Sequence, residues 1–291
     1  MAKTKNQRLV LSGSLEPLLK LLPLLSSIQN IELVGIIADS DKDLPAAQKQ
    51  IFISFDALTS KDLKALQADW LFNFDFPHRF SLELLDFFRA GAMNAHPGLL
   101  PKYAGAFPYQ WALRNDEAEA GATLHWMTDG TDGGAIALEQ TFPITDDDTG
   151  LSVYQQTIET SVQLVQNALN LISMGEKLPI MPQDKFKRRY FYPEDSKSCE
   201  IDWSISARKI FNFVRAGNFA PHSSPSYVAQ THLFQKTFQI RNCSLGERAL
   251  GQAGMVSSLK NGTHIVCGDG FTVILGTDTP TPPLKVGDIL G

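Results

Sequence analysis

The sequence predicts an α/β protein in which a parallel sheet is followed by a smaller, β-rich domain. Short apolar runs alternate with helical patterns through the first 176 residues, which is typical of parallel strands joined by helical crossovers. Short β-prone runs with frequent turns dominate the chain beyond residue 200. We therefore expect a Rossmann-like domain over 1–176, a linker over 177–200, and a C-terminal helix with a small β domain over 201–291.

The first domain opens with strands and helices in alternation. Arg8–Leu11 is a short apolar run that predicts a strand, and the leucine-rich segment 15–25 has a helical pattern. No Gly-x-Gly-x-x-Gly and no phosphate-loop lysine follow this strand, so neither a dinucleotide nor an ATP cofactor is predicted. Further strands are predicted at Ile31–Ala38, Ile51–Phe55 and Trp70–Phe74, and a helix near Lys61–Ala65.

A long helix and a linker end this domain. Thr149–Ser173 carries apolar residues at helical spacing and ends before Gly175, which predicts an amphipathic helix covering the sheet. In the linker, the basic and aromatic run Lys185–Tyr192 has the side chains that contact phosphates and stack on bases. We prefer to interpret it as an extended strap laid across the first domain, because the chain carries a net charge of −5 and no larger basic stripe.

The C-terminal region predicts one helix and several strands. Ala207–Ala216 has apolar residues at helical spacing. Turns such as Asn261-Gly262 separate the β-prone runs, which favours a small β-barrel or an open sheet. These runs are Ser226–Ala229, Thr237–Ile240, His264–Cys267 and Phe271–Leu275.

Composition and termini predict a cytoplasmic protein. Cys199, Cys243 and Cys267 lie far apart without a Cys-x-x-Cys pair, so neither a zinc site nor a disulfide framework is expected. The N-terminus lacks the apolar core of a signal peptide. The leucine-rich segment is interrupted by Lys20 and Pro23 and is too short to span a bilayer. We therefore expect no membrane partner and no metal.

The most informative stretch of the chain is 93–140. A short strand, Gly91–Ala95, leads into Asn94-Ala95-His96-Pro97, and Pro97 ends the strand so that Asn94 and His96 lie at its carboxyl end. Side chains two apart on a strand share a face, so both can reach one ligand atom. An amide can donate to an oxyanion, and an imidazole can pass a proton near neutrality.

Asp132 follows a second predicted strand, Ala122–Met127, in a glycine-rich turn. Its carboxylate can stabilise a protonated His96 or hold a water for proton relay. Taken singly, Asn-x-His-Pro and Asp-Gly are ordinary turn signals, and His125, which alternates with apolar neighbours, is better explained as a satisfied strand histidine. The conjunction of the three polar residues nevertheless favours proton-transfer chemistry on a carbonyl.

That conjunction resembles the 10-formyltetrahydrofolate-dependent formyltransferase family. The chain matches, in order, the family's Asn-x-His-Pro-x-Leu-Leu-Pro-x-Tyr-x-Gly, an aromatic-containing helix, Gly-x-Thr-x-His-x-Met and Asp-x-Gly-x-Ile. Ala104 and Gly133 depart from it, where many members carry Arg and Thr. The resemblance implies catalytic roles for Asn94, His96 and Asp132, 10-formyltetrahydrofolate as formyl donor without a metal, and an OB-like C-terminal domain.

The resemblance also indicates binding residues. The aromatic loop after the Trp70–Phe74 strand falls where the family builds its pterin pocket, although these aromatics would serve equally to cover the sheet edge. Residues after the His motif are assigned to the acceptor from their position alone, and Lys102 and Tyr103 could instead cap a turn. The expected folate contacts are Phe76, Pro77, His78 and Asp129, and the expected acceptor contacts are Lys102, Tyr103 and Trp111.

The expected acceptor is the primary amine of a small molecule, foremost a nucleotide-linked amino sugar. Methionyl-tRNA formyltransferases carry a basic, glycine-containing insertion after the second strand, whereas here that segment is only Asp39–Pro45, so nucleic acid is not the expected partner. Two same-chemistry alternatives remain, a methionyl-tRNA formyltransferase and a 10-formyltetrahydrofolate hydrolase. A folate-binding module without catalysis is a third, and a homodimer is compatible with all of them.

Overall fold

The computed structural model describes residues 6–74, 76, 78–233, 236–276 and 283–291. The chain forms two compact units. The first comprises Met1–Gly105, Gly121–Phe142 and Gln156–Tyr190, and the second comprises Ala106–Ala120, Pro143–Gln155 and Phe191–Gly291. The domain boundaries expected from the sequence stay predictions.

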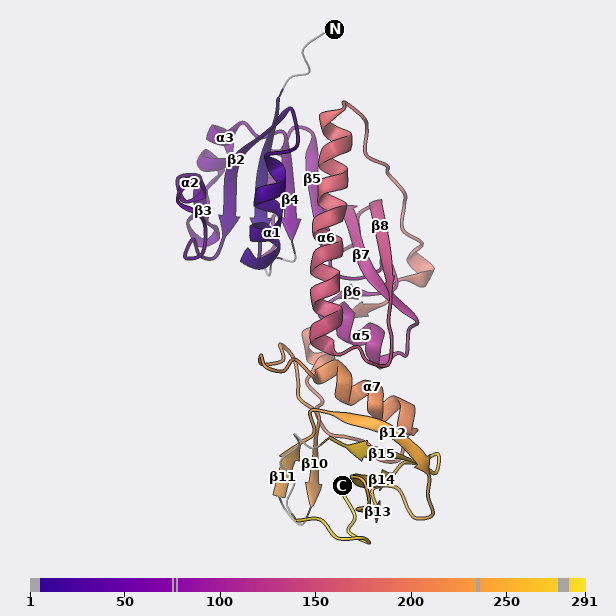
Figure 1. Cartoon of the computed structure of the whole chain (residues 1–291). Coiled ribbons are helices and arrows are strands. Elements are labelled where there is room, and N and C mark those ends of the chain that lie inside the picture. The colour runs from indigo at the N-terminus through magenta and orange to yellow at the C-terminus, as the bar shows by residue number, and fades with distance from the viewer. Residues whose placement is uncertain (1–5, 75, 77, 234–235, 277–282) are drawn as a thin grey trace. The chain divides into compact units, whose positions relative to one another are not determined.

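The first unit is built on a mainly parallel sheet of seven strands, so the predicted α/β class is confirmed (Figure 1). The spatial order is β3-β2-β1-β4-β5-β7-β8, and the β5–β7 pair is antiparallel. The strand order reverses between β1 and β4, which is where ligands bind in open α/β sheets. The strands are β1 (Gln7–Gly13), β2 (Ile31–Ala38), β3 (Phe52–Ser54), β4 (Trp70–Phe74), β5 (Gly91–His96), β7 (Glu119–Trp126) and β8 (Ile136–Pro143).

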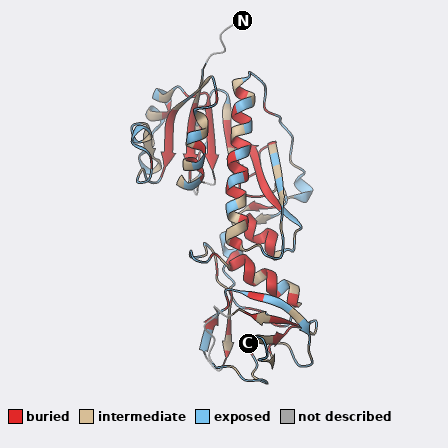
Figure 2. Ribbon diagram, in the orientation of Figure 1, coloured by how far each residue is buried: buried red, intermediate tan, exposed pale blue. Residues whose placement is uncertain are grey.

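Both faces of the sheet are covered by helices, as the alternation of side chains along β1 shows. Leu9 and Leu11 pack in a core with α1 (Leu15–Leu25) and with residues 156–173 of α6 (Gly150–Ser173). Val10 points to the other face, where α3 (Ser60–Leu66) and α4 (Leu82–Leu85) complete a second core. Figure 2 shows the central strands as buried along most of their length. The sheet is therefore held rigidly from both sides.

Short elements fill the connections. The predicted strand Ile51–Phe55 is shorter than expected, because Phe55 already begins the 3-10 helix η1 (Phe55–Ala57). The predicted strap contains the 3-10 helix η2 (Lys185–Lys187) and the short strand β9 (Tyr190–Phe191). Between them, the backbone carbonyl of Arg189 accepts a hydrogen bond from the Ala104 N–H. The remaining short elements are α2 (Ala46–Lys49), β6 (Ala104–Gly105) and η3 (Pro193–Ser196).

The second unit contains helices α5 (Pro108–Arg114) and α7 (Ala207–Gly217) and a four-stranded antiparallel sheet of order β12-β15-β14-β13. The predicted strand Ser226–Ala229 is wrong: the Tyr227 hydroxyl bonds the Phe213 carbonyl, and the strand begins only at Gln230. The strands are β10 (Gln230–Leu233), β11 (Lys236–Gln239), β12 (Cys243–Arg248), β13 (Val256–Ser258), β14 (Thr263–Val266) and β15 (Phe271–Leu275).

Within the described ranges, no helix combines the length and apolar character needed to cross a membrane. The same residues contain no group of three or more His, Cys, Asp or Glu side chains arranged to hold a metal ion.

Candidate active site

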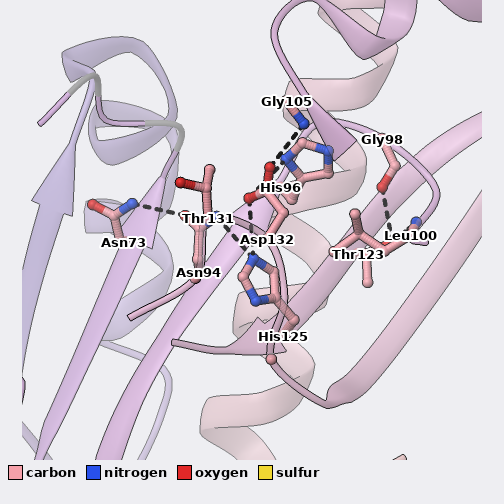
Figure 3. Close-up of polar contacts among 12 residues, drawn as sticks. Asn73, Asn94, His96, Gly98, Leu100, Gly105, Thr123, His125, Thr131 and Asp132 are labelled. Atoms are coloured by element: carbon pink, nitrogen blue, oxygen red, sulfur yellow. Dashed lines mark hydrogen bonds and ion pairs between the residues drawn. The ribbon is translucent and has the colours of Figure 1, made fainter. Parts of the chain in front are cut away.

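Asn94, His96 and Asp132 come together at the carboxyl end of the parallel sheet (Figure 3). Asn94 and His96 lie on β5, and Asp132 lies in the loop between β7 and β8. His96 is 3% exposed and Asp132 8% exposed, while Asn94 is half-buried. Two of the three polar groups are thus shielded from water, which strengthens every charge interaction between them.

Asp132 is held by donors on two sides. Its Oδ2 accepts a 2.9 Å hydrogen bond from the Gly105 N–H, and its Oδ1 lies 3.5 Å from Nδ1 of His96 and 3.6 Å from Nε2 of His125. Burial alone raises the pKa of this carboxyl. The charge on His96, the hydrogen bond and charge of His125, and the Gly105 N–H outweigh it and hold the pKa well below its ordinary value of 3.8. Asp132 is therefore a carboxylate at neutral pH.

His96 has protein acceptors at both ring nitrogens. Nε2 lies 2.6 Å from the carbonyl oxygen of Tyr103, which can only accept, so Nε2 carries a proton. Nδ1 faces the Asp132 carboxylate. An imidazolium with protons on both nitrogens satisfies this pair of acceptors, and it would be an electropositive group beside a developing oxyanion.

Asn94 is oriented by its strand neighbours. Its Nδ2 lies 3.0 Å from Nε2 of His125, and its Oδ1 accepts a 2.7 Å hydrogen bond from Nδ2 of Asn73 (Figure 3). His125 also contacts the carbonyl oxygen of Trp126 at 3.0 Å through Nδ1. His125 is therefore satisfied, as expected for a strand histidine, and in addition it links the Asn94 amide with Asp132.

The loop that carries Asp132 is held by Gln183 and by Arg188 of the strap, Lys185–Tyr192. Arg188 donates to the carbonyl oxygens of Thr131 and Asp132, each at 2.7 Å. Gln183 donates to the carbonyl oxygens of Asp132 and Gly134. These bonds hold Asp132 in the left-handed region at φ +51°, a conformation that costs free energy in a non-glycine residue.

Of the predicted folate contacts, Phe76 and His78 follow β4, and Asp129 follows β7. The rings of His78 and Phe55 stack with centroids 4.4 Å apart, Phe76 packs edge-on against both, and His78 Nε2 lies 2.7 Å from an Asp39 oxygen. The carbonyl oxygen of Asp129 accepts a hydrogen bond from Arg79. Pro77 lies outside the described residues.

The predicted acceptor contacts divide between the units. In the first unit, Lys102 is exposed and Tyr103 is buried, with the lysine ammonium 5.5 Å from the tyrosine ring centroid. Trp111 belongs to α5 in the second unit, where its ring stacks on Phe191 at 4.5 Å and the Arg114 guanidinium lies 4.2 Å from it.

Four further groups of the site were not predicted from the sequence. Two are backbone groups, the Tyr103 carbonyl and the Gly105 N–H, and these leave no trace in residue type. The third, Asn73, is the only polar residue in the run Trp70–Phe74, and a lone polar residue in a buried strand is a usable signal. The fourth, Arg188, was assigned only to the strap.

Comparison with known proteins gives a consistent result. The family model described as formyl transferase matches residues 44–169. A methionyl-tRNA formyltransferase of Clostridium novyi (strain NT) is 33% identical over 227 residues, which cover 77% of this chain and 71% of that protein.

Solved structures share the fold. An N-formyltransferase of Helicobacter canadensis, in complex with folinic acid and dTDP-3-aminofucose, superposes with a TM-score of 0.72 at 20% identity, covering 92% of this chain and 98% of the other. WlaRD, a sugar 3N-formyltransferase solved in the presence of dTDP and 5-N-formyl-tetrahydrofolate, superposes with a TM-score of 0.71 at 19% identity, covering 96% and 100%.

Proposed function

This chain belongs to the formyl transferase family, and from that premise we propose that it transfers a formyl group from 10-formyltetrahydrofolate to the primary amine of a nucleotide-linked amino sugar. The observation that carries the proposal is the cluster of half-buried Asn94 with buried His96 and Asp132 at the carboxyl end of the sheet. The folate and amino-sugar ligands of the Helicobacter canadensis protein support the choice of donor and acceptor.

The chemistry is an acyl transfer from nitrogen to nitrogen. The neutral amine attacks the formyl carbon, and the carbonyl oxygen of the tetrahedral intermediate takes up negative charge. The Asn94 amide and the His96 imidazolium stabilise that charge. The amine proton passes to a water held by Asp132, the bond from carbon to N10 breaks, and N10 takes up a proton from that relay. Asp132 orients the His96 ring, because its carboxylate faces Nδ1 of that ring.

The donor would be held by Phe76, Pro77, His78 and Asp129. The half-buried rings of Phe76 and His78 offer apolar faces at the end of β4, which suits a flat pterin. We propose that Lys102, Tyr103 and Trp111 serve the acceptor. The exposed Lys102 ammonium suits the phosphates of a sugar nucleotide.

A second candidate is methionyl-tRNA formyltransferase, which the Clostridium novyi relative favours. It requires a basic surface for tRNA, and binding would weaken steeply with salt. The net charge of −5 and the short segment Asp39–Pro45 after β2 argue against it.

A spectrophotometric assay of tetrahydrofolate formation from 10-formyltetrahydrofolate tests the proposal. The protein is assayed alone, then with a panel of nucleotide-linked amino sugars, other small amines and charged initiator tRNA. Turnover with an amino sugar alone is the expected result. Turnover with tRNA, together with a salt-sensitive shift of tRNA in a gel, establishes the second candidate. Turnover without any acceptor, at the same rate as with acceptors, identifies a hydrolase that releases formate.

A further inference from the structure

A row of four polar side chains crosses the centre of the sheet. Ser12 on β1 is in register with Asn73 on β4, Asn73 with Asn94 on β5, and Asn94 with His125 on β7. The Ser12 hydroxyl lies 2.7 Å from Oδ1 of Asn73, which continues the contacts from Asn73 to Asn94 and from Asn94 to His125. The row thus starts at the point where the strand order reverses.

The members of the row satisfy one another inside an apolar layer. Ser12 is fully buried, Asn73 is 5% exposed and His125 is 2% exposed. Three buried polar side chains in neighbouring strands are costly to fold unless each is hydrogen-bonded. Only Asn94 is half-exposed, so the row ends in an amide that a ligand can reach.

The hydrogen bonds of the row run in one direction. The Ser12 hydroxyl donates to Asn73 Oδ1, and Asn73 Nδ2 donates to Asn94 Oδ1. Asn94 Nδ2 then faces Nε2 of His125, whose Nδ1 faces the Trp126 carbonyl. Every member donates toward His125, and none can be reversed alone.

This direction determines which end of the Asn94 amide meets the substrate. One N–H of Asn94 points to His125, and among the described residues the other forms no hydrogen bond. With the amide reversed, its carbonyl oxygen would take the place of that donor and would repel an oxyanion. The second N–H is therefore available only while the row keeps its direction.

We propose that Ser12 and Asn73 are positioning residues, which fix the orientation of the Asn94 amide so that a donor rather than an acceptor faces the formyl oxygen. The inference rests on the proposed function of the site. Neither residue contacts the substrate directly, and both act through Asn94.

A double-mutant cycle tests the inference on the full chain, in the formyl-transfer assay with the acceptor that supports wild-type turnover. Asn73→Leu should lower kcat about 10-fold and Ser12→Ala about 2- to 10-fold, the range for one lost hydrogen bond, with KM for the donor unchanged. In the Asn94→Ala background, Asn73→Leu should have almost no further effect on kcat, because its route of action is gone.

Asn73→Asp provides a test of direction. The introduced carboxylate only accepts hydrogen bonds, so the Asn94 amide should rotate and turn its Nδ2 toward it. The kcat should then fall about 10²–10³-fold, the loss expected for an oxyanion donor. Thr160→Val is the matched control, since this buried hydroxyl bonds only the Gln156 carbonyl within α6. The control should lower the melting temperature without lowering kcat.

Equal losses from Asn73→Leu in the wild-type and Asn94→Ala backgrounds would overturn the inference, and so would an unchanged kcat in folded Asn73→Leu protein. If Asn73→Asp does not fold, the cycle with Asn73→Leu decides alone. Absence of formyl transfer by the wild-type protein, in contrast, contradicts the proposed function and not the positioning role.

Discussion

The Asn94 amide and the His125 imidazole face each other across the antiparallel pair β5 and β7, with Nδ2 and Nε2 3.0 Å apart. Because His125 also lies 3.6 Å from Asp132, one buried ring contacts both the amide and the carboxylate of the candidate site. The hydrogen-bond donor and the charged group of the site therefore both lie beside one side chain of β7.

Removal of the His96 imidazole is predicted to lower kcat about 10²–10⁴-fold, the range for a lost acid–base group. His96→Ala is compared with the wild-type protein in the tetrahydrofolate assay. His222→Ala, which removes an exposed histidine of the second unit, is the matched control and should keep the wild-type rate. A normal rate in folded His96→Ala would remove this residue from the mechanism.

Asn94→Ala is predicted to lower kcat about 10²–10³-fold, because one oxyanion donor is lost. The KM for the donor should change little if the hydrogen bond forms mainly in the transition state. Asn170→Ala, on an exposed position of α6, is the control. An effect confined to KM would instead assign Asn94 to ground-state binding.

The depressed pKa of Asp132 predicts a pH-dependent contribution to stability. A carboxyl whose pKa is lower in the folded state stabilises the fold above its unfolded pKa of about 3.9. That contribution is lost as the pH falls through the folded pKa. The free energy of unfolding of the wild-type protein should therefore exceed that of Asp132→Asn at pH 7.

Denaturant unfolding of both proteins measures this difference from pH 7 down to pH 3. We expect the difference to shrink as the pH falls below about 4, where the unfolded carboxyl begins to bind a proton. A difference that stays constant over the whole range would show that folding does not favour the ionised form of Asp132.

The strap is predicted to support catalysis through the Asp132 loop. Arg188→Ala removes the donors to the Thr131 and Asp132 carbonyls, and should lower kcat about 10- to 100-fold, since hydrogen bonds from charged groups contribute about 1.5–3 kcal/mol. Lys187→Ala is the control, because this neighbouring side chain is exposed and lies 3.9 Å from a carboxylate oxygen of Asp184. Equal rates for the two variants would limit the strap to a structural role.

Sequence patterns predicted the strands best where apolar runs are bounded by breaking residues. Ile31–Ala38, Trp70–Phe74 and Phe271–Leu275 match the observed strands residue for residue. The strand Cys243–Arg248 was not predicted, because its residues include Gly246, Glu247 and Arg248 and most of them are exposed. An edge strand of this composition lacks the alternation on which the prediction depends.

The site was predicted only in part, because some of its contacts follow from local spacing and others from long-range packing. The spacing of Asn94 and His96 on one strand is local information, and a side-chain period of two suffices to read it. The approach of Asp132 depends on a loop that residues 183–189 hold from far along the chain. The pairing of Ser12 with Asn73 depends on strand order, which a single sequence does not reveal.

The polar row also has a consequence for folding fidelity. A shift of one residue in the pairing of β1 or β4 would turn Ser12 or Asn73 away from its partner and leave a buried amide unsatisfied. Misregistered sheets are thereby penalised during folding, before any substrate is present. The three side chains that orient the Asn94 amide thereby also favour the correct strand register, so the folded chain already has the polar residues of its candidate site aligned.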